Sequence, residues 1–309
     1  MNDLAREELR RVPRGSACAL TIGVFDGVHL GHQFLFRHLI ERAHAAGLAA
    51  AAITLYPDPV KVLRPNEPLQ YLTSLEERLG LLHALGLDHV VPLTFTSELA
   101  ELSPQAFLTM LAEEIDLRLL LMGPDNAFGR NREATPERVR ELGQTLGFSV
   151  EVLPRPLAAN ERVVSATAIR EALAAGDLES VAAQLGRRYS IRGPVVVGDQ
   201  RGRTIGFPTA NIAITADRAL PAFGVYATWA QLGESRYASA TNIGWRPTIV
   251  SDAPTVETHI FDFVADIYGQ SLKIELVERL RSEIKFASLD ELKAQIGRDV
   301  ALAREILAR

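Results

Sequence analysis

Cysteine is nearly absent from this chain of 309 residues, since Cys18 is the single one. One thiol excludes an intrachain disulfide and a zinc site built from cysteines, and we expect it to be buried packing. The longest apolar runs, such as 48–55, fall short of the roughly 20 residues that cross a bilayer. The stretch 1–14 is polar and lacks the apolar core of a signal peptide, so we expect a cytoplasmic protein.

A positive charge balance is also missing, because 33 lysines and arginines stand against 38 aspartates and glutamates. A net charge of -5 argues against a general polyanion-binding surface, although a local basic pocket can hold a few phosphates. The content of 47% hydrophobic and 23% charged residues is typical of soluble globular proteins, and the length suits two domains. We therefore expect small-molecule substrates, with no nucleic acid and no membrane partner; the oligomeric state stays open.

The first predicted domain, residues 1–187, alternates short apolar runs with amphipathic stretches. Strands separated by helices imply βαβ crossovers, and hence an α/β domain with a parallel sheet covered by helices on both faces. The predicted strands are 19–24, 49–55, 90–93, 119–122 and 149–153. The predicted helices are 33–46, 75–85, 104–114, 135–146, 168–174 and 178–185.

The second predicted domain, residues 188–309, consists of strand-like runs separated by turn residues. A helix is predicted only at its end, over 288–307, where Ser288 and Glu291 have the spacing of a capping box. This pattern indicates an antiparallel Greek-key β-barrel closed by a C-terminal helix. The predicted strands are 190–197, 225–232, 237–243, 255–263 and 271–280.

The stretch 21–32, Thr-Ile-Gly-Val-Phe-Asp-Gly-Val-His-Leu-Gly-His, leads from the first predicted strand into the first helix. Its glycines allow a sharp turn and a close approach of the backbone to a ligand. His29 and His32 lie three residues apart on the opening turn of a helix, where they share a face and anions are favoured. The pattern favours a polyphosphate site over a pair of capping or buried histidines. It is neither a Rossmann fingerprint nor a P-loop, because Gly-x-Gly-x-x-Gly and Gly-Lys-Ser/Thr are absent.

This stretch resembles the His-x-Gly-His signature of the nucleotidyltransferase superfamily. More narrowly, 23–32 looks like the adenylyltransferase half of prokaryotic bifunctional riboflavin kinases/FAD synthetases. The segments 54–59, 121–130 and 165–170 resemble further motifs of that family. The resemblance implies a nucleotidyltransferase-type sheet and a reaction in which the FMN phosphate attacks the α-phosphorus of ATP and expels pyrophosphate to give FAD.

The resemblance also implies roles for single residues. His29 and His32 are the catalytic residues that it implies for this domain, where they stabilise the phosphates. Plain structural roles are open for others, since Ser165 and Thr167 can cap a helix and Phe128 can belong to the core. The implied substrate-binding residues are Gly23, Phe25, Asp26, Gly31, Asp125, Asn126, Phe128, Ser165, Thr167 and Arg170.

Four positions depart from the family pattern: Leu55 and Asn126 replace a usual Phe, Asp58 a usual His, and Ala166 a usual Ser. The first two changes remove aromatic surface that could line an FMN pocket. Asp58 exchanges a possible cation for an anion near phosphates. These departures motivate an alternative, a riboflavin kinase whose adenylyltransferase domain is impaired.

The second domain contains a long glycine-rich segment, 198–211, Gly-Asp-Gln-Arg-Gly-Arg-Thr-Ile-Gly-Phe-Pro-Thr-Ala-Asn. Such a segment indicates a shaped loop, on which Arg201 and Arg203 are candidates to receive phosphates. Thr209 and Asn211 offer hard oxygen ligands two residues apart, which suit a Mg²⁺ ion that keeps water and substrate phosphate as its other ligands. The alternative interpretation of this segment is a turn-rich hairpin with polar tips and no ligand.

The segment resembles the riboflavin kinase signature. The resemblance implies that Thr209 and Asn211 hold Mg²⁺ and that Glu257 is the catalytic base for the riboflavin 5′-hydroxyl. A carboxylate is chemically apt, because the alcohol loses its proton as the γ-phosphoryl group moves. A salt bridge on a strand face is the alternative for Glu257. Later segments that resemble the family are 221–226, 242–248, 256–260, 266–269 and 281–286. Further implied substrate-binding residues are Gly198, Arg203, Gly206, Phe207, Pro208 and Arg281.

The sequence therefore predicts a bifunctional enzyme that phosphorylates riboflavin to FMN with ATP and then adenylylates FMN to FAD. A non-enzymatic flavin-binding protein on the same scaffold is a further alternative. The presence of His29, His32 and Glu257 argues against it.

Overall fold

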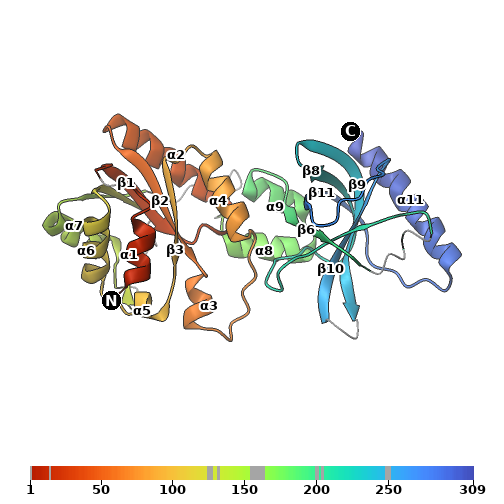
Figure 1. The fold of residues 1–309 in the computed structure, drawn as a ribbon, viewed down its shortest axis with the longest axis horizontal. Coiled ribbons are helices and arrows are strands. Elements are labelled where there is room, and N and C mark those ends of the chain that lie inside the picture. The colour runs from red at the N-terminus through yellow and green to blue at the C-terminus, as the bar shows by residue number, and fades with distance from the viewer. Residues whose placement is uncertain are drawn as a thin grey trace. The chain divides into compact units, whose positions relative to one another are not determined.

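The chain forms two compact units (Figure 1). The computed structural model describes residues 2–13, 15–123, 128–130, 133–153, 164–198, 202, 205–247 and 252–309. Unit 1 comprises Met1–Leu69 and Thr73–Ala166, and unit 2 comprises Gln70–Leu72 and Thr167–Arg309. No described helix has both the length and the apolar character that a membrane span requires.

A sheet of five parallel strands forms the centre of unit 1, which confirms the predicted parallel sheet (Figure 1). Its order is β3-β2-β1-β4-β5, so the winding reverses at β1. In open α/β sheets, ligands bind beyond the carboxyl ends of the strands at such a reversal. The strands are β1 (Cys18–Gly23), β2 (Ala49–Tyr56), β3 (His89–Thr94), β4 (Leu117–Met122) and β5 (Ser149–Val152).

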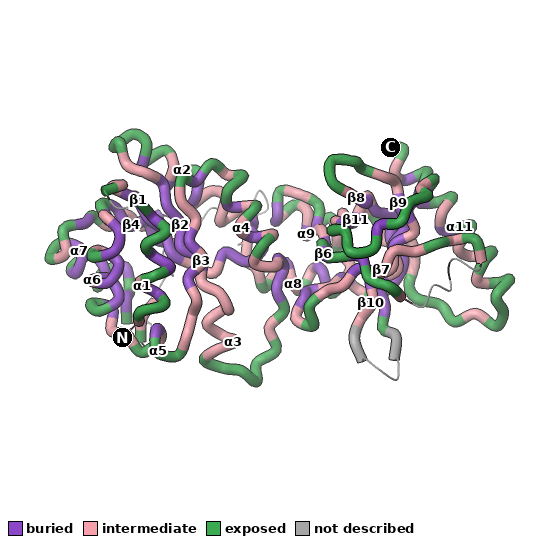
Figure 2. Tube along the Cα trace, viewed as in Figure 1, coloured by how far each residue is buried: buried purple, intermediate pink, exposed green. Residues whose placement is uncertain are grey.

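Helices cover both faces of this sheet, as predicted. Adjacent residues of β1 point to opposite faces, so that Leu20 joins one apolar cluster and Ala19 the other. The first cluster includes Leu108 and the second includes Phe36, and Figure 2 shows the strands between them as buried. The helices of unit 1 are α1 (Asp3–Leu9), the 3₁₀ turn η1 (Asp26–Val28), α2 (Leu30–Ala45), α3 (Pro59–Leu63), α4 (Leu75–Ala84), α5 (Ser97–Ala100), α6 (Pro104–Glu114) and α7 (Pro136–Leu146).

Side-chain caps determine where several helices begin. Ser74 and Glu77 form a reciprocal capping box at the start of α4, which satisfies two backbone N–H groups. The helix α2 begins at Leu30 rather than at the predicted residue 33, because the side chain of His29 caps it. The helices α1, α3 and α5 had no counterpart in the sequence analysis.

Unit 2 contains a closed barrel of antiparallel strands in the order β10-β7-β6-β11-β8-β9, as predicted. The strand β7 has only three residues and begins at the end of the predicted glycine-rich loop. The terminal helix begins after Ser288, whose side chain caps it by accepting from the N–H of Glu291. The Glu291 carboxylate accepts from the N–H of Ala287 at 3.1 Å, so the predicted reciprocal capping box is formed only in its Ser288 half. The elements are α8 (Ala166–Ala175), α9 (Leu178–Leu185), β6 (Ser190–Val196), β7 (Ala210–Ile212), β8 (Gly224–Leu232), β9 (Ser235–Pro247), β10 (Asp252–Ile260), β11 (Ser271–Arg281) and α11 (Leu289–Leu307).

The two faces of the barrel wall differ in character. Thr228, Thr241 and Thr258 are fully buried and joined by hydrogen bonds of 2.8 and 2.9 Å between their hydroxyl groups. Since side chains alternate along a strand, Glu257 lies on the opposite face from Thr258. The helix α11 packs on that outer face, where its Ala303 contributes to an apolar cluster with residues of β8 and β9.

Three residues from an early part of the chain, Gln70–Leu72, belong to unit 2. The N–H of Tyr71 donates to the carbonyl of Asp217 at 2.7 Å, and its carbonyl accepts from the N–H of Ala219 at 2.9 Å. The helices α8 and α9 also cluster with the barrel. The domain limits of 1–187 and 188–309 stay a prediction.

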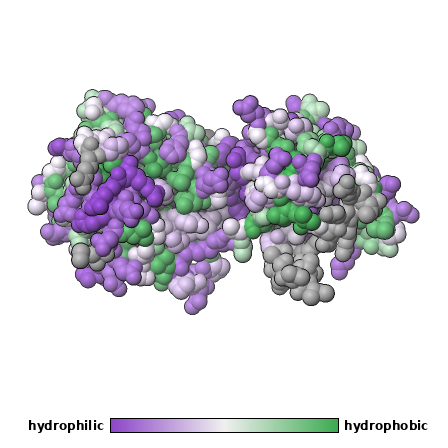
Figure 3. Space-filling model, in the orientation of Figure 1, coloured by the Kyte–Doolittle hydropathy of each residue, from purple (hydrophilic) through white to green (hydrophobic). Residues whose placement is uncertain are grey.

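The surface of both units mixes polar and apolar residues (Figure 3). An apolar area is visible on the face of the barrel unit in that view. Among the described residues of this unit, Val197 and Val264 are exposed apolar side chains.

Candidate active sites

The first candidate site follows the carboxyl end of β1, at the reversal point of the sheet. Between β1 and α2 the chain makes a tight turn from Phe25 through η1, in which Phe25 has φ 54° and Val28 has φ 40°. A left-handed backbone is strained for residues with a side chain, at a cost on the order of 1–3 kcal/mol each. A Cβ at Gly23 would lie 2.8 Å from the ring of Phe25, so this glycine makes room for the ring.

Buried hydrogen bonds hold this turn in place. Asp26, which is 4% exposed, accepts at Oδ1 from the N–H and the hydroxyl of Thr73, both at 3.1 Å. The same oxygen faces Nη2 of Arg78 at 3.4 Å. The N–H of Gly27 donates to the Thr73 hydroxyl at 3.1 Å. The carboxylate of Asp26 is thus engaged by the protein itself.

His29 and His32 lie together at the start of α2. Their rings stack with centroids 3.6 Å apart, and Nδ1 of His29 accepts from the N–H of His32 at 3.4 Å. A Cβ at Gly31 would lie 3.2 Å from the His29 ring, so Gly31 leaves space for the stack. Phe25 meets the His32 ring edge-on at 5.2 Å.

The charge state of His32 follows from these surroundings. Burial, and then the nearby His29 and Arg78, lower the pKa of His32 well below its ordinary value of 6.5. Its Nδ1 is buried and makes no hydrogen bond with the described residues. His32 is therefore a neutral imidazole at pH 7.

The other residues predicted for this site are distributed along the chain. Phe128 packs against Phe107 at the margin of one core cluster, with ring centroids 5.5 Å apart. Ser165 belongs to unit 1, whereas Thr167 and Arg170 belong to unit 2. Two further predictions, Asp125 and Asn126, lie outside the described residues.

Two of the unusual residues have local roles. Asp58 caps α3 by accepting from the N–H of Val60 at 2.9 Å. Leu55 is partly buried and packs against one of the two core clusters.

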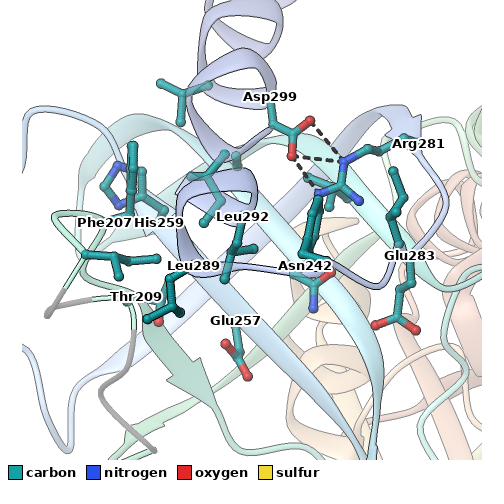
Figure 4. A pocket seen from close by; sticks show the side chains of 18 of the residues that line it. Phe207, Thr209, Asn242, Glu257, His259, Arg281, Glu283, Leu289, Leu292 and Asp299 are labelled. Atoms are coloured by element: carbon teal, nitrogen blue, oxygen red, sulfur yellow. Dashed lines mark hydrogen bonds and ion pairs between the residues drawn. The ribbon is translucent and has the colours of Figure 1, made fainter. Parts of the chain in front are cut away.

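The second candidate site is a cavity of about 520 Å³ between the outer face of the barrel and α11 (Figure 4). Its wall combines apolar side chains of α11 with polar side chains of the barrel strands. The lining residues are Gly202, Ile205, Phe207, Thr209, Asn211, Val225, Ala240, Asn242, Glu257, His259, Arg281, Glu283, Ile284, Phe286, Leu289, Leu292, Ile296, Asp299 and Val300.

Strand register brings the polar residues of this cavity side by side. Glu257 of β10 pairs directly with Asn211 of β7 on one side and with Asn242 of β9 on the other. The same row continues through Val225 of β8 to Arg281 of β11. All five residues line the cavity, in which Glu257 and Asn242 lie on the barrel side and the leucines of α11 lie opposite.

The predicted glycine-rich loop lies at one side of this cavity. A Cβ at Gly198 would collide with the amide of Asn211. Phe207 contacts the ring of His259 edge-on at 5.5 Å, and Nδ1 of His259 pairs with the carbonyl oxygen of Pro208 at 2.8 Å. Gly206 is exposed with φ 87°, which glycine adopts without strain. The predicted Arg203 lies outside the described residues.

A second hollow of about 410 Å³ adjoins the first, and Thr209 lines both. Its remaining wall comes from β6, β7 and the loop before it, β10 and the segment after β10. The lining residues are Val195, Pro208, Thr209, Ala210, Thr258, Ile260, Phe263, Val264, Ala265, Asp266, Ile267 and Tyr268. Across the described part of the chain, no group of three or more His, Cys, Asp or Glu side chains could hold a metal ion.

Comparison with known proteins decides the family. The model described as FAD synthetase matches residues 12–168, and the model described as riboflavin kinase matches 185–307. The bifunctional riboflavin kinase/FMN adenylyltransferase of Escherichia coli (strain K12) is 38% identical over 93% of this chain and 92% of that protein. The protein of the same description from Bacillus subtilis (strain 168) is 35% identical over 91% and 89%. The chain belongs to this family.

A solved structure shares the whole fold. It is described as a macrolide-efflux protein from Streptococcus pneumoniae, with a TM-score of 0.84, 30% identity and coverage of 96% of both chains. The words macrolide-efflux describe the pneumococcal protein, and what this chain shares with it is the fold. Both family models and the curated relatives name flavin chemistry for sequences like this one.

Family membership confirms the predicted pair of activities. The chain is a bifunctional riboflavin kinase and FMN adenylyltransferase, a transferase of FMN and FAD biosynthesis. The alternative with kinase activity alone is disfavoured, because the FAD synthetase model matches most of the first unit.

In the riboflavin kinase region, Asp299 is an acidic residue of the cavity wall that no motif in the sequence identified. Asp299 of α11 is buried and accepts from Nε and Nη2 of Arg281 at 2.8 to 3.0 Å. Gln295 donates to the same carboxylate at 2.8 Å. The sequence did contain a signal for this residue: Asp299 is an acid on the buried stripe of α11, four residues before Ala303, and an acid at such a position needs a partner.

Proposed function

We propose that the cavity under α11 binds riboflavin and that Glu257 accepts the proton of its 5′-hydroxyl. One observation carries the proposal: Glu257 stands between Asn211 and Asn242 in a row of paired residues that line a largely apolar cavity. The apolar wall suits the flavin ring, and the row supplies a carboxylate among hydrogen-bonding partners. The ribityl hydroxyl would lose its proton to Glu257 as its oxygen forms a bond to the γ-phosphorus of ATP and the bond to ADP breaks.

The neighbouring hollow is the proposed nucleotide site of the kinase. It shares Thr209 with the riboflavin cavity, so substrates in the two hollows would meet beside Thr209. The hydroxyl of Thr209 and the amide oxygen of Asn211 are hard ligands of the kind that Mg²⁺ prefers, and both residues line the riboflavin cavity. A Mg²⁺ ion bound there would neutralise charge on the transferred phosphoryl group. The proposed substrate contacts in this region are Gly198, Arg203, Gly206, Phe207, Pro208 and Arg281.

For the second reaction we propose that the start of α2 binds the phosphates of ATP. The N-terminus of a helix favours anions, and a neutral His32 can donate one N–H to a phosphate oxygen. An oxygen of the FMN phosphate would form a bond to the α-phosphorus as the bond to pyrophosphate breaks. His29 and His32 would stabilise the charge of the departing pyrophosphate. The proposed substrate contacts are Gly23, Phe25, Asp26, Gly31, Asp125, Asn126, Phe128, Ser165, Thr167 and Arg170.

Separate assays of the two steps test both assignments on one chain. Glu257→Gln should lower kcat for riboflavin phosphorylation by roughly 10²- to 10⁴-fold, the range for loss of a general base, and leave FMN adenylylation unchanged. His29→Asn should give the reverse pattern. Glu278→Gln, an exposed glutamate of β11 in the same barrel, is the matched control and should change neither rate. If Glu257→Gln phosphorylated riboflavin at the wild-type rate, Glu257 would not be the base of this reaction.

A further inference from the structure

Arg78 is among the largest side chains that are fully buried in the molecule. It lies on α4, which no motif of the sequence analysis includes. A charged side chain is almost never fully buried unless it is paired, so its contacts identify what it does.

Its guanidinium group joins three segments that border the first candidate site. Nη1 donates to the carbonyl of Val24 at 2.7 Å and faces the carbonyl of Leu55 at 3.5 Å. These carbonyls lie just beyond the end of β1 and near the end of β2, on the side of the sheet where ligands bind. Nη2 faces Asp26 in the turn between β1 and α2.

The turn that Arg78 contacts has a backbone that its own sequence disfavours. Phe25 and Val28 both have positive φ, and Val28 is β-branched. Such a conformation persists only where surrounding contacts hold it. Thr73, just before α4, adds hydrogen bonds to Asp26 and Gly27. The residue that directly follows this turn is His29.

We propose that Arg78 is a positioning residue for FMN adenylylation, which holds the turn from Phe25 to Val28 so that His29 and His32 face the nucleotide phosphates. The inference rests on the function proposed above for the two histidines. Without the guanidinium group, the turn relaxes toward ordinary backbone angles, and the imidazole pair moves with it. A displacement of about 1 Å from a productive geometry can cost about a hundredfold in rate.

The test compares Arg78→Met, Arg78→Lys and Thr73→Val with the wild-type chain. Arg78→Met should lower kcat for FAD formation about a hundredfold while riboflavin phosphorylation, measured in the same preparation, changes less than about twofold. Arg78→Lys keeps a cation that can reach one of the carbonyls, and we expect it to recover part of the loss. Imidazole resonances of His29 and His32 in nitrogen-correlated NMR spectra should shift in Arg78→Met and return toward wild type in Arg78→Lys.

Arg138→Met is the matched control, because Arg138 lies on the exposed side of α7 and pairs with Glu141. It should leave both activities and the histidine resonances unchanged. A folded Arg78→Met variant with wild-type FAD formation would overturn the proposal. If that variant does not fold, Thr73→Val decides, since it removes a hydroxyl that bonds to Asp26 and Gly27 of the turn without leaving a charge unpaired. Lower FAD formation with unchanged riboflavin phosphorylation would then support the dependence on a held turn, and wild-type FAD formation would overturn the proposal.

His29→Asn separates this inference from the assignment on which it rests. Wild-type FAD formation by His29→Asn would refute the proposed role of the histidine, and with it the proposal for Arg78. Loss of FAD formation in His29→Asn, together with full activity in Arg78→Met, would refute the positioning role alone.

Discussion

Replacing Asp299 with asparagine tests the largely buried ion pair between α11 and the barrel. The side chains of Arg281 and Asp299 are 17% and 7% exposed, and their atoms approach to 2.8 Å. Removing one partner of a buried pair costs about 3 to 5 kcal/mol, because the other charge stays buried. Asparagine keeps one oxygen that can accept from the guanidinium group. We therefore expect the free energy of unfolding of the barrel to fall by about 3 kcal/mol, the lower end of that range.

Intrinsic fluorescence can report this change for the barrel by itself. The chain has two tryptophans, Trp229 and Trp245, and both belong to unit 2. Urea unfolding followed by their emission should show a lower midpoint for Asp299→Asn. The control is Asp290→Asn, which removes an exposed acid from the first turn of the same helix and its interaction with the helix dipole, about 0.3 to 1 kcal/mol. Equal midpoints for the two variants would refute the stabilising role of the pair.

The same variant should also affect substrate binding. Arg281 lines the proposed riboflavin cavity, and Asp299 holds its guanidinium group there. With that anchor weakened, we expect KM for riboflavin to rise while KM for FMN in adenylylation stays unchanged. An unchanged KM for riboflavin in folded Asp299→Asn would show that the ion pair stabilises the cavity wall but does not contribute to riboflavin binding.

Three further predictions concern other parts of the chain. Gly198→Ala should weaken ATP-dependent phosphorylation and not FAD formation, because its Cβ would displace the amide of Asn211; steady-state kinetics of both steps checks this. His32 should stay neutral in an NMR titration to below pH 6.5, since its pKa is lowered, and the unfolded chain then binds more protons than the native one. Stability of unit 1 should therefore fall with pH below about 6.5, and less so in His32→Asn. Burial raises the pKa of the Cys18 thiol, so Ellman's reagent should label it only when unit 1 unfolds; rapid labelling of the native protein would contradict this.

The elements that could be predicted from the sequence are those with a clear period and length. Alternation of apolar strands and amphipathic helices predicted the parallel sheet, whose five strands all occur. The strand β7 escaped prediction because its three residues come at the end of a segment rich in glycine, and β-structure there depends on pairing with β6 and β10. The start of α2 was placed too late because the capping residue is a histidine, which is not among the usual caps.

Of the residues at the candidate sites, those in contiguous motifs could be predicted from the sequence and those brought together by folding could not. Motifs that are contiguous in the sequence, such as 21–32 and 205–211, identified residues that the structure gathers at one turn and at one cavity wall. Partners that approach only after folding could not be identified. Arg78 lies about fifty positions from the turn that it contacts, and Asp299 pairs with a residue on another element.

The two candidate sites are positioned by different physical means, and this predicts where each reaction is vulnerable. In the barrel, Glu257 faces the cavity because strand pairing fixes its register with Asn211 and Asn242. A shift by one residue would turn its side chain to the other face of the wall, so the ladder itself preserves the site. In unit 1, by contrast, the turn before His29 is strained and depends on the side chains of Thr73 and Arg78.

Substitutions outside the recognisable motifs should therefore impair adenylylation more often than phosphorylation. Two of the unusual residues, Leu55 and Asp58, leave the contacts that support the turn intact. Asp58 is engaged as a helix cap and Leu55 packs against the core, while Arg78 faces the backbone carbonyl of Leu55. A side-chain change at residue 55 thus leaves that acceptor in place, whereas a change at residue 78 removes the donor.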